Sequence, residues 1–266
     1  MLRVTHNAGF FSCCQVRLEA IVGYYNEKGR LPIYIDSSEQ YALYSNGKKN
    51  IIEQFFQNKD ITIPSGPLTW GPWLGEPQFA NLHTIRYDQI SPLVNRYFSP
   101  TPEIIRRVNF LKIKYNIHPA ETCVLFYRGT DKVREVGVPS YTDVYQRANS
   151  KRIWLQSDES EFLRLGKINF PNACIMEDEI RHTREAKTVD ILNTSTNQEY
   201  AKWFLAIVLL MSECETVVCG TGNINLWIAL FRGHSRGIQQ YRCLLPKVYG
   251  ITQRPAETNT IWCEHA

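Results

Sequence analysis

The order of apolar and polar positions predicts strands that alternate with amphipathic helices. Mainly apolar runs, typical of buried strands, occupy residues 122–127, 152–157, 173–177 and 215–220. Stretches with apolar residues at helical spacing occupy residues 101–119, 140–149, 159–168, 198–213 and 223–233. Because strands that alternate with helices form parallel sheets covered on both faces, the pattern predicts an α/β protein.

The first hundred residues give a shorter version of the same pattern. A helix is expected at 15–29, ending on a glycine, then a strand at 30–36 and a short helix at 50–57. Residues 59–82 are rich in Pro, Gly and Trp, which indicates a loop. Three of its aromatic residues could stack on a ligand ring or fill a groove between domains, and we favour the second role. They are Trp70, Trp73 and Phe79.

Two prolines interrupt the pattern in "NRYFSPTP", residues 95–102. A domain boundary is therefore expected there, between an N-terminal domain of residues 1–98 and a C-terminal domain of residues 99–266. With 266 residues, of which 44% are hydrophobic, the chain has enough apolar material for a packed core.

The net charge of +4 is mild for this length. Nucleic-acid-binding proteins usually have a concentrated basic face, so the composition does not suggest that class. It is compatible with an enzyme that binds an anionic small molecule at one local basic site.

The cysteines and the N-terminal residues indicate the cellular compartment in which the protein is expected. None of the eight cysteines forms a C-x-x-C pair, so no zinc site is indicated. Several lie in apolar runs, where free thiols pack as small hydrophobes in a reducing compartment, although disulfides stay open. The N-terminus lacks the features of a signal peptide, and the most apolar stretch, 203–211, is shorter than the ~20 residues of a membrane span. A soluble, cytoplasmic protein without a membrane span is expected.

Polar clusters follow three of the predicted strands: "YRGTDK" at 127–132, "QSDES" at 156–160 and "GTGN" at 220–223. In open parallel sheets, ligands bind beyond the carboxyl ends of the strands. Arg128 carries a planar fork of donors suited to phosphate, and Gly129 permits a sharp turn. The glycines of the third cluster precede a helix, whose free N–H groups attract anions.

Each cluster also has a plain structural alternative. Arg128 could belong to an internal ion pair. Asp158 could accept hydrogen bonds from a sugar or base, or be the N-cap of the next helix, and Thr221 or Asn223 could cap the helix that follows them. The coincidence of three clusters at one sheet edge favours a binding site.

The stretch "FYRGTDK", residues 126–132, resembles the H-x-R-R-x-D-K segment of the fucosyltransferase-like glycosyltransferases. That family includes core α1,6-, nodulation and protein O-fucosyltransferases. Residues 6–36 are similar to the family's opening loop, helix and strand. Residues 140–163 and 212–233 are similar to its "T-D" and "D-x-x-V-C-T-x-S-S" regions.

The resemblance implies a GT-B-like α/β fold with two Rossmann-like domains and parallel sheets, the N-terminal one reduced in this short chain. It implies transfer of fucose or another deoxyhexose from a nucleotide-diphosphate donor, usually GDP-fucose, to a glycan hydroxyl. The partners expected are therefore this donor and a glycan acceptor, without nucleic acid. The family needs no metal and no further cofactor.

The resemblance also assigns roles to single residues. Arg128 would neutralise the donor diphosphate, and Asp158 would contact the nucleoside. Asp131 and Lys132 would hold the loop and approach donor or acceptor. Four further residues correspond to positions that contact the donor phosphates in the family: Gly9, Thr221, Gly222 and Asn223.

The chain departs from the family at several positions. In the helix before the "V-C" strand, Ala206 and Ile207 stand where the family has an acidic residue. Phe126 stands in place of the histidine and Gly129 in place of the second arginine, so one cation is missing and the identities of nucleotide and sugar stay open. The family's putative catalytic glutamate corresponds to Val136, one position after Glu135. Glu135 is therefore the first candidate for the base that takes the acceptor proton, with Asp131 second; Glu135 could also be a solvated surface charge.

Two other functions fit parts of the pattern. A non-catalytic module with the same fold and a nucleotide or glycan cleft is favoured by the missing arginine. An NAD-dependent oxidoreductase is a poor fit, because Asn225 occupies the third glycine position of the dinucleotide fingerprint.

Overall fold

The computed structural model describes residues 1–45, 51–70, 79–129, 132–134, 136–177, 179, 197–243 and 260–264. Its helices are α1 (Phe10–Lys28), α2 (Tyr87–Tyr97), α3 (Pro102–Lys114), α4 (Tyr141–Tyr145), α5 (Ser160–Asn169), α6 (Asn197–Glu213) and α7 (Asn223–Arg232). Its strands are β1 (Leu2–Arg3), β2 (Ile35–Asp36), β3 (Phe56–Gln57), β4 (Ser99–Pro100), β5 (Thr122–Tyr127), β6 (Arg152–Ser157), β7 (Cys174–Ile175), β8 (Thr216–Cys219), β9 (Ile238–Cys243) and β10 (Thr260–Glu264).

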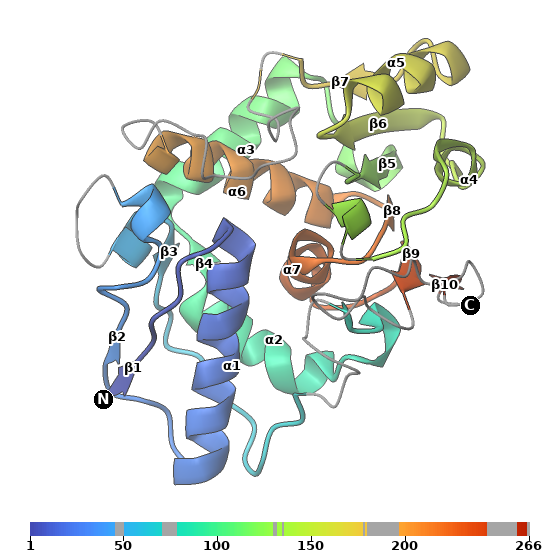
Figure 1. Cartoon of the computed structure of the whole chain (residues 1–266). Coiled ribbons are helices and arrows are strands. Elements are labelled where there is room, and N and C mark those ends of the chain that lie inside the picture. Colours follow the sequence, from blue (N-terminus) through green and yellow to red (C-terminus); the bar gives the residue numbers. More distant parts are fainter. Residues whose placement is uncertain are drawn as a thin grey trace.

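A six-stranded sheet with the order β10-β9-β8-β5-β6-β7 forms the centre of the C-terminal half (Figure 1). Strands β9, β8, β5, β6 and β7 are parallel, and β10 is antiparallel to β9. The mixed α/β architecture with a mainly parallel sheet agrees with the prediction from the apolar pattern.

The apolar runs that the sequence marked as strands are buried because helices cover both faces of the sheet. All six residues of β5 are buried. Val124 and Phe126 belong to the larger core cluster, which includes α6, and Leu125 and Tyr127 belong to a second cluster formed with α4 and α5. Alternate residues of one strand thus fill two different layers, which is why β5 and β6 read as continuous apolar runs.

Helix starts and stops follow the expected signals in several places. Pro102 begins α3, and the left-handed Gly29 and Gly233 end α1 and α7 with φ of 63° and 74°. Helix α1 begins at Phe10, five residues earlier than the apolar spacing predicted.

The N-terminal half is smaller than the pattern suggested. The predicted strand 30–36 is reduced to the two residues of β2, which pair with β1 in parallel. Within the predicted helix 50–57, residues Ile51–Gln54 form a single 3₁₀ turn, and Phe56–Gln57 form β3, which pairs with β4.

The sequence pattern gave no indication of α2, β9 and β10. Helix α2 contains Pro92 within its span, a residue that normally argues against a helix interior. Strand β10 is the next described element after β9 and pairs with it antiparallel, in the register Trp262 to Tyr241.

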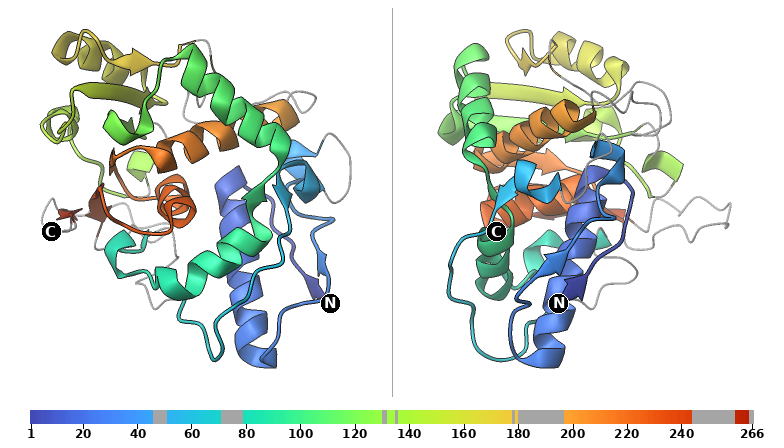
Figure 2. Two further views of the ribbon diagram at one scale, coloured as in Figure 1. Left: turned by 180° about the vertical axis from the view of Figure 1, so that it is seen from behind. Right: turned by 90° about the vertical axis from the view of Figure 1, so that its left-hand side faces the viewer.

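The two halves of the chain share one hydrophobic core. Phe10 and Phe11 of α1 belong to the same cluster as Trp227 of α7, and α7 packs against α1, α2 and α6 (Figures 1 and 2). The boundary at residues 98 and 99 stays a prediction. Within the described part of the chain, no helix combines the length and apolarity that crossing a membrane requires.

Candidate functional site

The carboxyl ends of β5 and β6 are joined by a hydrogen bond. The strands pair in register up to Tyr127 and Ser157. One residue further on each strand, Arg128 and Asp158 follow, and the Asp158 carboxylate accepts a hydrogen bond of 3.2 Å from the Gly129 N–H. Asp158 is only 6% exposed. The first two predicted polar clusters therefore meet at this sheet edge.

The third cluster meets the first through Lys132. This lysine is 5% exposed, and a β-carbon on Gly222 would lie 3.1 Å from its Cε and 3.6 Å from its Nζ. Its ammonium also lies 5.7 Å from the ring centroid of Phe79. The loop after β5 thus brings a buried cation to the start of α7.

No side chain caps the start of α7. Gly222 is the N-cap, with φ of 152°, a backbone conformation that side chains rarely allow. The Thr221 hydroxyl instead donates to the Tyr241 carbonyl at 2.9 Å. The alternative prediction that Thr221 or Asn223 caps this helix is wrong, and the first-turn N–H groups keep the polarity that suits an anion.

Arg128 is half-buried and faces a cavity. The cavity lies between the ends of β5 and β6 and helix α6, and its lining is Phe126, Arg128, Gln156, Ser157, Asp158, Phe204, Ile207 and Met211. Burial raises the pKa of Tyr200 on α6, with Arg128 opposing and Asp158 adding to this shift. A cation, a carboxylate and a phenol therefore lie near one another beside an apolar wall.

Asp158 is not a helix cap. The N-cap of α5 is Glu159, and no side chain makes a capping hydrogen bond there. The N-cap alternative for Asp158 is therefore wrong, and the carboxylate is directed to the loop that carries Arg128.

The start of α1 lies beside the same region. Gly9 is the N-cap of α1, and a β-carbon there would meet no atom within 4 Å. Phe11 contacts Phe204, which lines the cavity, with ring centroids 5.2 Å apart. In the preceding loop, the His6 Nε2 and the Ser12 hydroxyl are hydrogen-bonded at 2.9 Å.

Three residues of interest were not singled out from the sequence. Gln156 interrupts the apolar face of β6, Tyr200 faces the strand ends from α6, and Glu159 lies beside Gly129. The only sequence signal for the first was a polar residue inside a buried strand. The base candidates Asp131 and Glu135, like Trp73, lie outside the described residues, whereas Trp70 packs against the core.

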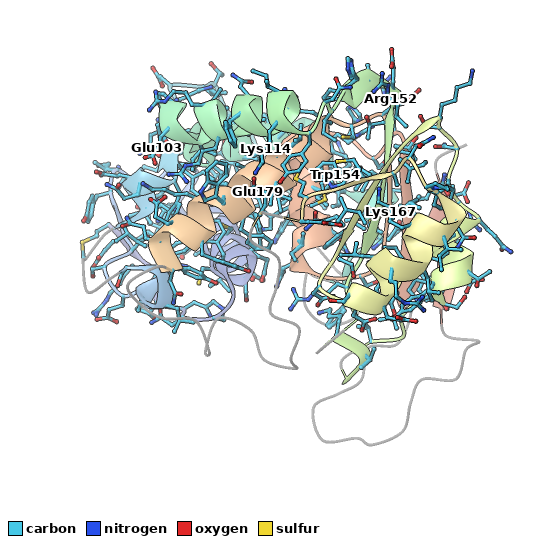
Figure 3. The ribbon with its side chains drawn as sticks, turned by 90° about the horizontal axis from the view of Figure 1, so that it is seen from above. Glu103, Lys114, Arg152, Trp154, Lys167 and Glu179 are labelled. Atoms are coloured by element: carbon cyan, nitrogen blue, oxygen red, sulfur yellow. The ribbon has the colours of Figure 1, made fainter. Side chains whose placement is uncertain are left out.

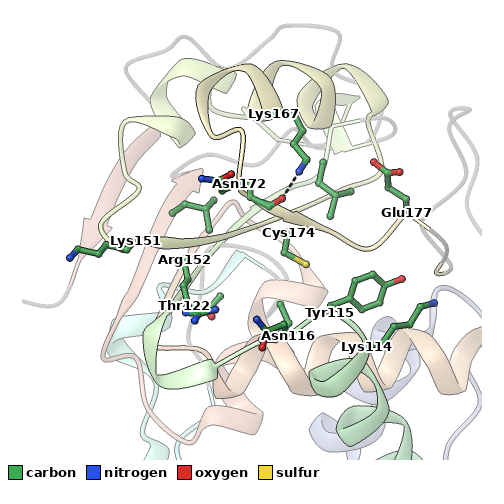
Figure 4. A pocket seen from close by; sticks show the side chains of 14 residues that line it. Lys114, Tyr115, Asn116, Thr122, Lys151, Arg152, Lys167, Asn172, Cys174 and Glu177 are labelled. Carbon is green, nitrogen blue, oxygen red and sulfur yellow. Dashed lines mark hydrogen bonds between the residues drawn. The ribbon is translucent and has the colours of Figure 1, made fainter.

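A larger cleft, of about 680 Å³, lies at the opposite ends of the strands (Figures 3 and 4). Cationic side chains line it, but they are engaged locally. Lys114 binds Glu179 at 2.6 Å, Lys167 donates to the Ala173 carbonyl at 2.6 Å, and Arg152 binds Glu121 at 3.0 Å. Size alone does not make this cleft the better candidate, because Lys114 and Arg152 are already ion-paired and Lys167 is bonded to a carbonyl.

Comparison with other sequences identifies no relative: no protein-family model matches the chain, and no curated protein matches it. Comparison of the folds is informative. The chain has the GT-B-like fold of the fucosyltransferases, as its strand-end motif predicted.

Three solved structures illustrate the similarity. The NodZ α-1,6-fucosyltransferase soaked with GDP-fucose matches with a TM-score of 0.56 at 12% identity, over 100% of this chain and 99% of that one. The NodZ enzyme co-crystallised with GDP gives a TM-score of 0.53 at 14% identity, over 90% and 94% of the two chains. Fucosyltransferase NodZ from Bradyrhizobium gives 0.52 at 13%, over 91% and 94%.

Proposed function

We propose that this protein is a glycosyltransferase that moves fucose, or another deoxyhexose, from a GDP-linked donor to a hydroxyl of a glycan acceptor. The observation that carries the proposal is the convergence of Arg128, Asp158 and Lys132 with the uncapped start of α7 at one sheet edge. The similar NodZ structures, one co-crystallised with GDP and one soaked with GDP-fucose, support the choice of nucleotide.

In this proposal, fixed positive charge replaces a metal ion. The bond between sugar and diphosphate breaks as the acceptor hydroxyl attacks, and negative charge develops on the diphosphate. The Arg128 guanidinium, the Lys132 ammonium and the N–H groups of Gly222 and Asn223 stabilise that charge. Gly9 and Thr221 adjoin the same phosphates.

Two further roles complete the mechanism. Asp158 accepts hydrogen bonds from the nucleoside, and its buried carboxylate is already oriented by the Gly129 N–H. Glu135 takes the proton of the acceptor hydroxyl, with Asp131 as the second candidate. Residues 1–98 would then hold the acceptor side and residues 99–266 the donor.

The direct test is donor binding and turnover. Wild-type protein is expected to bind GDP with a clear rise in melting temperature and to transfer or slowly hydrolyse GDP-fucose. Arg128→Ala should abolish both effects, since one diphosphate cation is lost. The matched control is Arg164→Ala, which removes an exposed arginine of α5 paired with Glu161 and should change neither. No shift with any nucleoside diphosphate at millimolar concentration would refute the proposal.

A non-catalytic nucleotide or glycan-binding module is the second candidate. Gly129 favours it, because the second arginine of the family motif is missing. GDP binding without any transfer or hydrolysis, over a panel of nucleotide sugars and glycans, would identify the protein as such a module. Turnover that is lost in Arg128→Ala would exclude it.

A further inference from the structure

The outward face of helix α3 carries large apolar side chains in contact with solvent. Ile105, Phe110 and Ile113 are 43%, 49% and 82% exposed. Residues three or eight positions apart lie on the same side of a helix, so Ile113 stands between the other two. Among the residues that the structure describes, no other helix exposes more than one large apolar side chain. Apolar surface gathered on one face of a folded protein marks an interaction site.

The charged side chains on this face are cations. Arg106 is exposed and makes no hydrogen bond or ion pair with a described residue. The Lys114 ammonium lies 5.8 Å from the ring centroid of Phe110. The one acidic residue of the helix, Glu103, is turned toward α6, where it binds Lys202 at 2.9 Å. The outward face therefore combines apolar side chains with positive charge.

The large cleft at the carboxyl end of α3 continues this positive surface. Figure 3 shows Arg152 beyond that end of the helix, on the same side of the molecule, and Figure 4 shows the lining of the cleft. Four cations line the cleft against one carboxylate: Lys114, Lys151, Arg152 and Lys167 against Glu177. Lys151 has no ion pair with a described residue, and the pair of Arg152 with Glu121 is exposed. Exposed ion pairs are weak, so a phosphate can replace one partner.

We propose that the outward face of α3 and the adjoining cleft bind the protein to the surface of a membrane that contains anionic lipids. Ile105, Phe110 and Ile113 enter the boundary between headgroups and acyl chains. Arg106 and the cations of the cleft bind the lipid phosphates. The protein lies on the bilayer by this contact and does not cross it. The inference is independent of the proposed function, because it involves no nucleotide.

A bilayer suits this face better than a second copy of the chain. A symmetric dimer contact pairs one surface patch with itself, so the cations of the two copies would meet without an acidic partner on the helix face. Ile113 projects from the helix, as its exposure shows, and does not line a groove that could hold it. A projecting apolar side chain flanked by cations is typical of helices that lie at a membrane interface.

This orientation leaves the candidate donor site open to water. The cleft beside α3 adjoins Thr122 and Arg152, the first residues of β5 and β6. Arg128 and Asp158 follow the last residues of the same two strands. Contact with a membrane at the first ends of the strands therefore does not cover the opposite sheet edge.

Sedimentation with lipid vesicles tests the proposal. Wild-type protein should bind vesicles of equal parts phosphatidylcholine and phosphatidylserine at least about tenfold more tightly than vesicles of phosphatidylcholine alone, and added salt should weaken the binding. Ile113→Ser removes the most exposed apolar side chain of the face and should weaken binding about tenfold. Arg106→Glu reverses one charge and should weaken binding by about the same factor.

Matched substitutions at another surface control for nonspecific effects. Ile33→Ser changes an isoleucine that is 90% exposed between α1 and β2, and Arg30→Glu reverses a charge in the same segment. Both should bind vesicles as the wild type does. All four substitutions replace exposed side chains, so melting temperatures should stay close to that of the wild type.

Three results would overturn the proposal: no binding to the anionic vesicles, equal binding to both kinds of vesicle, or full binding by both α3 variants. Sedimentation equilibrium tests the alternative occupant. A wild-type dimer that Ile113→Ser dissociates, in protein that does not bind vesicles, would assign the face to a second copy and also overturn the proposal. Each of these outcomes leaves GDP binding and the proposed function unaffected.

Discussion

The carboxylate of Glu159 occupies the space beside the α-carbon of Gly129. A β-carbon on residue 129 would lie 2.0 Å from Glu159 Oε1 and 2.7 Å from the Tyr127 ring. The Tyr141 hydroxyl donates a hydrogen bond to the same carboxylate. The family's second arginine therefore has no room in this chain unless Glu159 and the ring of Tyr127 move.

Gly129→Ala should consequently destabilise the protein by about 1–3 kcal/mol, the usual cost of overpacking. Chemical denaturation measures this change. Gly23→Ala, on α1 with no atom within 4 Å of the added carbon, should instead stabilise by up to about 1 kcal/mol. If Glu159 is the obstacle, the double variant Gly129→Ala, Glu159→Ala should cost less than the sum of its single changes. Additive costs would contradict this account.

Glu103 makes the stability of the α3–α6 contact depend on pH. Burial alone would raise its pKa, but hydrogen bonds from Arg107 and Lys202 outweigh this and lower the pKa below the ordinary 4.5. The unfolded chain then binds more protons than the folded one, so the contribution is present above pH 4.5 and is lost as the pH falls through the folded pKa.

Melting temperatures measured from pH 3 to pH 6 should show a smaller acid-induced fall for Glu103→Gln than for the wild type. Glu27→Gln, at an exposed position of α1, controls for the removal of any carboxyl group. Parallel curves for wild type and Glu103→Gln would show that the ion pair does not contribute.

Phe10 lies at the centre of the aromatic part of the core that residues 1–98 contribute. It is 1% exposed and contacts the rings of Phe11, Tyr44 and Phe55 at centroid distances of 5.2, 5.5 and 4.9 Å. Phe10→Ala should cost about 3–5 kcal/mol of unfolding free energy, because a large buried ring leaves a cavity. Urea denaturation followed by two probes should still give one transition, since the core spans both halves. Ile113→Ala, at a position 82% exposed, should change stability by no more than about 0.5 kcal/mol. Two separate transitions would argue against a shared core.

Cysteine reactivity should follow burial. Desolvation raises the pKa of Cys174 to about 11, against the opposing charge of Lys167. Alkylation of Cys174 in native protein should therefore be slow at pH 7.5 and accelerate about tenfold per pH unit toward pH 10, because the thiolate is the reactive form. Peptide mapping by mass spectrometry measures this rate, and Cys174→Ser supplies the blank. The fully buried Cys14 and Cys214 should react only after unfolding. Rapid labelling of Cys174 at neutral pH would contradict the burial argument.

The central strands were predictable because burial on both faces leaves a strong mark on sequence. Thr122–Tyr127 and Arg152–Ser157 were predicted with the bounds that the structure has. Helix α2 was missed because Pro92 lies inside it, and β10 because its strand is formed by pairing with β9 and not by an apolar run of its own. Local patterns carry no information about such tertiary pairing.

The site was predictable only in part, because its residues come from different segments of the chain. Arg128, Asp158 and Gly222 could be predicted from the sequence since each follows a strand, and the sheet topology brings them together. Gln156 and Glu159 were missed because the residues beside them in space, on α6 and in the loop after β5, are far from them in sequence. The motif alone shows that an arginine is missing at 129, whereas the steric reason appears only when residue 159 is placed beside it.

Two described residues that follow Arg128 are held in place: Asp158 accepts a hydrogen bond from the Gly129 N–H, and Lys132 packs on Gly222. The positions of Gly129 and Lys132 are thus set by folding, before any donor binds. Binding of an anionic donor should accordingly need little rearrangement of these two residues.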